Sequence, residues 1–308
     1  MVDVNFFGVA DTPALRLLYL RQTAPTPRIC PGFHFRLGAP EAEWQVVGTW
    51  ELDAFLAQRE QRTPRQKAIY LQQEPPGMRW PEATPLQSFA ALLTPLVMDV
   101  EGPVQFVGPP ALPWTYGIHV EMREGVGHWF SEQGGVDWEE LRTAPPPVKE
   151  RLCSMVVSRK GFLPGHRARL HFLQTLQNHF HNRIDFFGFG SRPIPDKRAA
   201  IDPYLFSIAV ENSVHPNYWT EKIADLYLGH AMPIYHGAPN IHHFFDPTSL
   251  QTIDIDAPDE AIARIEHLLD HPDAYHAQSV AAARHTLLHE HNTLEWLRRG
   301  IHHLRQEA

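Results

Sequence analysis

Short apolar runs and amphipathic segments alternate along the second half of the chain. Residues 205–210 form an apolar run that is too short for a helix and ends abruptly at Glu211, which indicates a strand covered on both faces. After a polar loop, apolar residues at spacings of three and four over 223–230 predict a helix that Thr220 caps. Residues 233–235 predict the next strand. This stretch therefore reads as a β-loop-α-β unit.

The same alternation predicts further strands and helices in both halves. In the second half we expect strands over 153–157, 184–187 and 252–255, a helix over 167–180, and two or three helices from residue 258 onward. In the first half we expect strands over 4–9, 33–37, 68–72 and 104–107 and helices over 52–59 and 86–93. Alternating strands and helices favour parallel sheets with crossover helices, so the predicted class is α/β. The second half reads as a doubly wound domain of nucleotide-binding type.

The run Ala144-Pro145-Pro146-Pro147 cannot continue a helix or a sheet and is typical of a linker. The 308 residues suffice for two domains of about 150 residues each. We therefore expect an N-terminal domain over 1–147 and a C-terminal domain over 148–308.

Composition restricts the classes of partner. The chain has 27 Lys and Arg against 35 Asp and Glu, a net charge of −8, which argues against nucleic acid or an anionic membrane as the main partner. Two cysteines suit a reducing compartment. The N-terminal residues show no targeting pattern, and nowhere do about 18 apolar residues run unbroken. We expect a cytoplasmic protein without a transmembrane segment, and peripheral membrane contact stays open.

Lys222 stands in the first turn of the predicted helix after Thr220. A cation there opposes the helix dipole at a cost of a few tenths of a kcal/mol, roughly, unless an anion lies between them. A bound phosphate would resolve the conflict. The alternative is a lysine that extends into water.

The polar and turn residues of this region resemble a known signature. They resemble the donor-binding signature of the bacterial-type family 10 glycosyltransferases, the α-1,3/1,4-fucosyltransferases. The residues that carry the resemblance are Glu211-Asn212-Ser213, Tyr218, Thr220-Glu221-Lys222, Pro233 and Gly237. The likeness extends weakly from about Cys153 to Ser249, roughly half the chain.

The resemblance implies a GT-B architecture, in which two Rossmann-like domains face each other across a cleft. It implies inverting transfer of L-fucose from GDP-fucose to a hydroxyl of a glycan that contains GlcNAc or glucose, as in an α-1,3-fucosyltransferase. The acceptor would be an oligosaccharide or a glycolipid, in protein glycosylation or in lipopolysaccharide or glycan biosynthesis. No cofactor or metal would be obligatory, and a divalent cation would be at most stimulatory. Whether the last helix packs back on the first domain stays open.

The resemblance also implies which residues contact the donor. Breaking the bond to a diphosphate gathers negative charge on the leaving group, which Arg and Lys side chains stabilise. Matched to the family's positions, the implied donor-binding residues are Arg169, Glu211, Asn212, Tyr218, Glu221 and Lys222. Arg167 replaces Arg169 if the register is two residues off, and either arginine alone fits an exposed basic face. Glu211 also fits a structural carboxylate bonded to loop amides, and Asn212 a turn residue.

Inversion in one step needs a general base, which a carboxylate from the other domain suits. Residues 69–74, Ile-Tyr-Leu-Gln-Gln-Glu, resemble the strand end that supplies the family's base, which makes Glu74 the candidate. Gln73 replaces the glycine usual before that glutamate, and a plain carboxylate at a strand end is the alternative. Trp114 and Tyr116 offer faces for acceptor sugars or for packing.

Two other patterns favour no metal site. Asp254 and Asp256 have the Asp-x-Asp spacing that can hold a divalent ion, but the alternation of side chains along a strand places both on the solvent face of a predicted strand. The 20 histidines, which include His285 and His289, are not accompanied by a His-Glu-x-x-His motif or by paired cysteine ligands.

Two rival functions stay open: a transferase with another nucleotide sugar, and a nucleotide-sugar or glycan binding protein without turnover.

Overall fold

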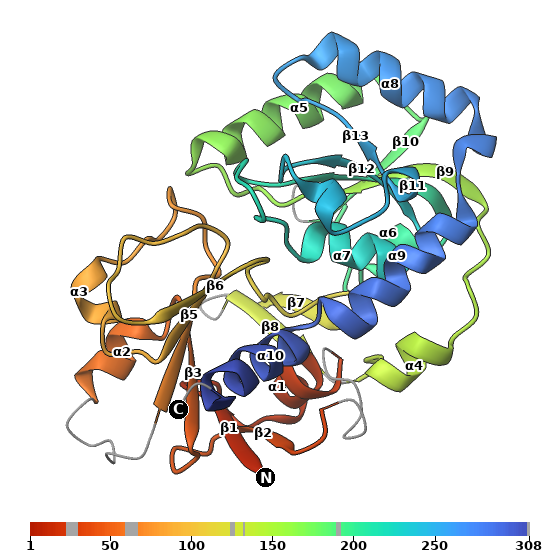
Figure 1. The fold of residues 1–308 in the computed structure, drawn as a ribbon. Coiled ribbons are helices and arrows are strands. Elements are labelled where there is room, and N and C mark those ends of the chain that lie inside the picture. Colours follow the sequence, from red (N-terminus) through yellow and green to blue (C-terminus); the bar gives the residue numbers. More distant parts are fainter. Residues whose placement is uncertain (23–29, 59–66, 124–126, 132, 189–191, 307–308) are drawn as a thin grey trace.

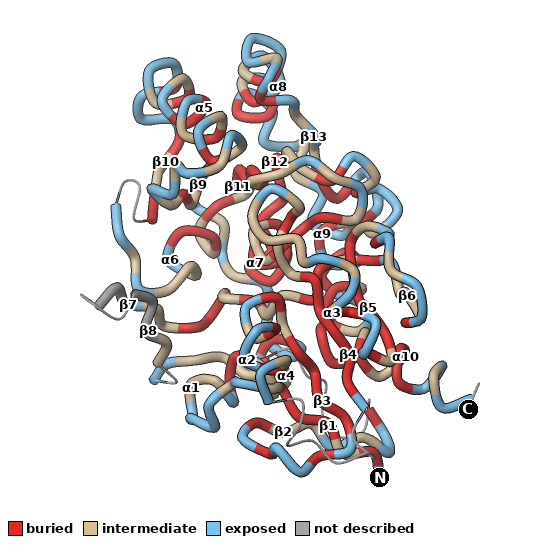
Figure 2. Tube along the Cα trace, turned by 90° about the vertical axis from the view of Figure 1, so that its left-hand side faces the viewer, coloured by how far each residue is buried: buried red, intermediate tan, exposed pale blue. Residues whose placement is uncertain are grey.

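The chain forms two lobes, each built around a parallel sheet (Figure 1). The structure is a computed structural model, and it describes residues 1–22, 30–58, 67–123, 127–131, 133–188 and 192–306. Buried residues gather in the sheets, whereas exposed residues lie mainly on outer helices and loops (Figure 2). The predicted α/β class is therefore confirmed.

The first sheet has six parallel strands in the order β2-β1-β3-β4-β5-β6. Its strands are β1 (Val2–Phe6), β2 (Phe33–Leu37), β3 (Trp44–Gly48), β4 (Lys67–Leu71), β5 (Ala91–Thr94) and β6 (Val104–Val107). Its connections hold α1 (Pro13–Arg16), a π-helical turn (Leu17–Arg21), α2 (Leu52–Ala57) and α3 (Ala83–Leu86). Successive residues Ile69 and Tyr70 enter two different apolar clusters, as the alternation of side chains along a strand requires. Both faces of the sheet are therefore covered.

The second sheet has five parallel strands in the order β10-β9-β11-β12-β13. Its strands are β9 (Arg151–Val156), β10 (Ile184–Phe187), β11 (Tyr204–Val210), β12 (Met232–His236) and β13 (Gln251–Thr252). Its helices are α5 (Pro164–Phe180), α6 (Arg198–Ile201), α7 (Glu221–Leu228), α8 (Pro258–Asp270) and α9 (Ala277–Glu290), with 3-10 turns at Ile241–His243, Pro247–Ser249 and Pro272–Ala274. Helices α5 and α8 cover one face, and α7 and α9 the other (Figure 1). All residues of β11 except Leu205 are buried, which confirms the predicted strand covered on both faces.

The strand order of the second sheet places a switch point between β9 and β11. The chain leaves β9 toward β10 on one side and leaves β11 toward β12 on the other. Open α/β sheets bind ligands in the crevice at the carboxyl ends of such strands. Here those ends are Val156 and Val210.

The chain crosses between the lobes more than once. Helix α10 (Thr293–Gln306) returns to the first lobe, where Leu297 and Ile301 share an apolar cluster with Val4 (Figure 1). In the other direction, Trp114 and Trp138 join the core of the second lobe. Trp138 begins α4 (Trp138–Thr143), and an antiparallel hairpin of β7 (His119–Arg123) and β8 (Gly127–Ser131) lies between the lobes (Figure 1). The boundary after residue 147 stays a prediction.

Some predicted elements are wrong or shifted. The helix over 86–93 does not form, because α3 ends at Leu86 and β5 pairs with β4 and β6 from Ala91. That short apolar run fits either periodicity, and tertiary pairing decides. The strand over 252–255 ends at Thr252, and Asp254 enters a turn. The helix predicted over 52–59 runs over 52–57, and residue 59 lies outside the described residues.

Candidate functional site

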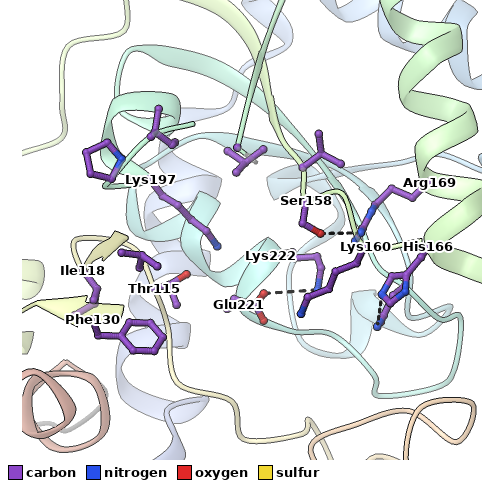
Figure 3. Close-up of a pocket in the computed structure, with 17 residues that line it drawn as sticks. Thr115, Ile118, Phe130, Ser158, Lys160, His166, Arg169, Lys197, Glu221 and Lys222 are labelled. Atoms are coloured by element: carbon purple, nitrogen blue, oxygen red, sulfur yellow. Dashed lines mark hydrogen bonds and ion pairs between the residues drawn. The ribbon is translucent and has the colours of Figure 1, made fainter. Parts of the chain in front are cut away.

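A cavity of about 270 Å³ lies at the carboxyl ends of β9 and β11 (Figure 3). Its apolar side includes Ile118, Val120 and Phe130, which come from the β7–β8 hairpin and the loop before it. Its polar side, from the second lobe, includes Ser158, Lys160, His166, Arg169, Lys197, Asn212, Glu221 and Lys222. The cavity therefore joins an apolar wall to a wall rich in cations.

The start of α7 is held by a buried carboxylate. Glu211 accepts hydrogen bonds from the Thr220 amide at 2.9 Å, from the Thr220 hydroxyl at 2.9 Å and from Lys222 Nζ at 3.0 Å. The Thr220 side chain caps the helix by accepting from the Lys222 amide at 3.3 Å. Glu211 does not line the cavity. The structural alternative for Glu211 is therefore the one that the contacts support.

Lys222 lines the cavity beside two carboxylates. Its Nζ lies 3.0 Å from Glu211 Oε2 and 3.6 Å from Glu221 Oε1. Burial opposes its charge, but the carboxylates outweigh burial and raise the pKa of Lys222. For Glu221, burial is outweighed by the charges of Lys222 and Lys197, which lower the pKa of Glu221 to about 2. The conflict between Lys222 and the helix dipole is thus compensated within the chain.

Arg169 reaches the cavity from the first turns of α5, and Arg167 does not line it. The Arg169 guanidinium is buried and donates to the Ser158 hydroxyl at 3.1 Å, while its Nε has no hydrogen-bond partner among the described residues. Burial lowers the pKa of Arg169, against the carboxylates of Glu211 and Glu221. Arg167 is exposed and donates to the carbonyl of Phe162 at 3.2 Å. Of the two predicted arginines, Arg169 is therefore the one that lines the cavity.

Asn212 lines the cavity, whereas Tyr218 lies behind it. Tyr218 is buried and donates to Asn212 Oδ1 at 3.3 Å. Burial raises the pKa of Tyr218 far above its usual range. The other end of the Asn212 amide lies 3.4 Å from His166 Nε2. Tyr218 thus contacts the lining residue Asn212 and does not itself line the cavity.

Glu74 follows β4 in the first lobe and does not line the cavity. Its Oε1 accepts from Trp50 Nε1 at 3.1 Å. Burial raises the pKa of Glu74, and the charges of Lys160 and Lys222 oppose that rise. Glu74 therefore lies near enough to both lysines for their charges to act on it, and its role as the base stays a prediction.

A second carboxylate on α7 ties the loop before the hairpin to this wall. Asp225 is buried and accepts from the amides of Thr115 and Tyr116 at 3.0 Å each, and from Lys197 Nζ at 2.5 Å. Lys197, Thr115 and Asp225 were not predicted from the sequence as site residues. The spacing of Asp225 from Lys222, about one helical turn, was the available signal.

The aromatic residues proposed for acceptor stacking are packing residues. Trp114 and Tyr116 are 2% and 7% exposed and belong to the core of the second lobe. The Tyr116 hydroxyl donates to Asp202 at 2.7 Å. Of the two alternatives for these rings, packing is therefore the one that their burial supports.

The acidic pair and the histidines also have local roles. Asp254 and Asp256 are exposed, as expected, but lie in a turn, where Asp254 Oδ1 accepts from the Asp256 amide at 3.0 Å. The rings of His285 and His289 stack at a centroid distance of 4.0 Å. In the described part of the chain, no three or more His, Cys, Asp or Glu side chains are grouped so as to hold a metal ion. None of the described helices is long and apolar enough to span a bilayer.

Comparison with known proteins agrees with the resemblance in the second half. Residues 146–279 match the family model described as glycosyltransferase family 10 (fucosyltransferase), C-terminal region. The chain is similar to an α-(1,3)-fucosyltransferase of Helicobacter pylori, with 37% identity over 83 residues, which are 27% of this chain and 17% of that protein. It is similar to a 3-galactosyl-N-acetylglucosaminide 4-α-L-fucosyltransferase of Homo sapiens, with 25% identity over 240 residues, 75% of this chain and 58% of the relative. The chain thus spans only part of the length of these relatives.

The fold also resembles solved structures. An α1,3-fucosyltransferase solved with GDP superposes with a TM-score of 0.53 at 18% sequence identity, covering 91% of this chain and 80% of that chain. At this level of identity the likeness concerns the fold alone. It confirms the predicted GT-B architecture of two lobes with parallel sheets.

Proposed function

Because the second half of this chain belongs to glycosyltransferase family 10, we propose that the protein is an inverting fucosyltransferase. GDP-fucose would be its donor, and a hydroxyl of a glycan that contains GlcNAc or glucose its acceptor. One observation carries the proposal: four of the six implied donor-binding residues line one cavity at the switch point of the sheet, namely Arg169, Asn212, Glu221 and Lys222.

The cationic wall suits a nucleoside diphosphate. Departure of GDP gathers negative charge on its phosphates, and preorganised cations stabilise that charge most where water is excluded. Arg169 is buried, and its fork presents an Nε without a hydrogen-bond partner among the described residues. Two parallel bonds from a guanidinium match two phosphate oxygens. Glu221, ionised at neutral pH, is available to accept from ribose hydroxyls.

Glu74 suits the role of general base. In the proposed step, a Glu74 oxygen accepts the proton of the acceptor hydroxyl, and the hydroxyl oxygen forms a bond to the anomeric carbon. The bond from that carbon to the β-phosphate oxygen breaks, and GDP leaves with the electron pair. Burial raises the pKa of Glu74 toward the range in which a base works well near neutral pH. The Trp50 indole orients the carboxylate by its hydrogen bond at 3.1 Å.

Two measurements test this function. Ligand binding shifts the melting temperature, and GDP at 100 times its Kd stabilises the folded protein by about 2.7 kcal/mol. We expect stabilisation by GDP and none by UDP or CMP at equal concentration. Stabilisation by UDP alone would indicate a UDP-sugar as the donor in place of GDP-fucose. Release of GDP from GDP-fucose with a panel of disaccharide acceptors then measures transfer, and no release with any acceptor would favour a binding protein without turnover.

The role of the base is tested by Glu74→Gln. Loss of a general base lowers kcat by about 10²- to 10⁴-fold. We expect that loss with an unchanged Kd for GDP, because Glu74 does not line the cavity. Glu82→Gln, an exposed carboxylate of the same lobe, is the matched control and should transfer like the wild type. Full activity of Glu74→Gln would exclude Glu74 as the base.

A further inference from the structure

Two of the four cations that line the cavity are already paired with carboxylates. Lys197 Nζ lies 2.5 Å from Asp225 Oδ2. Lys222 Nζ lies 3.0 Å from Glu211 Oε2, with Glu221 Oε1 at 3.6 Å. These lysines stabilise the chain's own carboxylates, so only part of their charge is left for a bound anion.

The other two cations have no carboxylate partner among the described residues. Within the described part of the chain, Arg169 donates only to the Ser158 hydroxyl. Lys160 is exposed, lines the cavity, and has neither a hydrogen bond nor an ion pair with any residue that the structure describes. Figure 3 shows Lys160 with Arg169 and Lys222 on one side of the cavity and Lys197 on the other. The unpaired positive charge is therefore concentrated where Arg169 stands.

Lys160 also decides the net charge of the wall. The four cations lie with three carboxylates in and next to the wall: Glu221 lines the cavity, whereas Glu211 and Asp225 do not line it but pair with Lys222 and Lys197. Without Lys160 the charges of these side chains would cancel. A diphosphate carries two or three negative charges. A wall without net charge would attract it only through those cations that lie close to the phosphates.

We propose that Lys160 is a second diphosphate ligand beside Arg169 and supplies the positive charge that Lys222 was expected to supply. The inference rests on the proposed function, because it assumes that the cavity takes a nucleoside diphosphate. The exposed lysine moves onto the phosphates when the nucleotide enters and bonds them through its ammonium group. GDP carries more negative charge than GDP-fucose, so Lys160 stabilises the departing nucleotide more than the bound donor.

Lys160→Gln tests the inference, with Arg159→Gln as the matched control, because Arg159 is exposed, adjacent in sequence and does not line the cavity. We expect the Kd for GDP to rise about tenfold in Lys160→Gln, as for loss of one charge-assisted contact. The Kd for guanosine should not change, and Arg159→Gln should bind GDP like the wild type. The salt dependence of GDP binding should also weaken in Lys160→Gln, because one cation fewer meets the phosphates. In transfer assays kcat should fall more than KM rises.

Equal GDP affinity in Lys160→Gln and the wild type would overturn the inference and leave the proposed function standing. If the wild type prefers UDP to GDP, the donor assignment fails, and the same comparison with UDP and uridine still decides the role of Lys160. Inorganic pyrophosphate, titrated into both variants, isolates the phosphate contact from the base. A wild type that binds neither a nucleoside diphosphate nor pyrophosphate would overturn both proposals.

Discussion

Glu211→Gln should destabilise the second lobe strongly, even though it changes one atom. The Glu211 side chain is fully buried, at 0% exposure, and its oxygens accept from the Thr220 amide, the Thr220 hydroxyl and Lys222 Nζ. A glutamine keeps the shape and can still accept from Thr220. It presents no charge to Lys222, and its amide group adds a donor that faces the ammonium group.

The magnitude follows from the burial of the pair. Removing one partner of a buried ion pair costs about 3–5 kcal/mol. Lys222 is 26% exposed and keeps Glu221 at 3.6 Å, so we expect the lower end, about 3 kcal/mol. For a lobe of this size that lowers the melting temperature by about 6–12 °C. Lys222→Met should cost a similar amount, and the double variant should cost less than the two losses together, since no charge is left without its partner.

Thermal and urea unfolding at pH 7 without nucleotide measure these differences. Asp270→Asn breaks an exposed ion pair with Arg183 in the same lobe and should stay within about 1 kcal/mol of the wild type. A Glu211→Gln variant that melts with the wild type but no longer binds GDP would refute the reasoning. Glu211 would then be the donor ligand that the resemblance implied, and its buried contacts would be incidental.

Two further predictions concern the same cavity. Because the charges of Lys222 and Lys197 outweigh burial and lower the pKa of Glu221 from 4.5 to about 2, its ionised form contributes stability fully above pH 4.5 and loses it as the pH falls toward 2. Glu221→Gln should therefore flatten the decline of the free energy of unfolding between pH 5 and 2, and an unchanged decline in urea titrations would contradict this. Gly165→Ala places a methyl group against the Asn212 carbonyl oxygen, so it should cost about 1–3 kcal/mol and weaken GDP binding. Gly161→Ala, whose nearest neighbour is Leu170 Cδ1 at 3.7 Å, should do neither.

The sequence predicted the second lobe better than the first for a physical reason. Strands such as β11 are buried on both faces, so their sequences are continuous apolar runs. The N-cap of α7 is the side chain of Thr220, a residue type that favours this position. In the first lobe, the run after Leu86 fits either a helix or a strand, and only pairing with β4 and β6 selects the strand. The strand β3 was not predicted, although Trp44–Gly48 is its sequence.

The site residues that belong to one sequence motif were predicted, whereas most of those from separate segments were not, with Arg169 on α5 as the exception. Asn212, Glu221 and Lys222 lie within one short stretch, and they do line the cavity. Lys160 and Lys197 reach it from loops whose course depends on the packing of β9 and α6. The role of each residue in the motif also depends on how deeply its side chain is buried, which the sequence pattern does not reveal. Glu211 and Tyr218 bond to internal partners, and Lys222 pairs with two carboxylates.

The return of α10 to the first lobe affects how the protein is made. Leu294, Leu297 and Ile301 complete an apolar cluster whose other buried members, apart from Cys30, lie in β1 to β5. During synthesis those strands emerge before α10, and part of one face of their sheet stays uncovered until α10 has followed them. An excised N-terminal fragment would expose the same face to neighbouring molecules. A stable isolated first lobe, or a chimera that exchanges it, would therefore need the C-terminal helix supplied along with it.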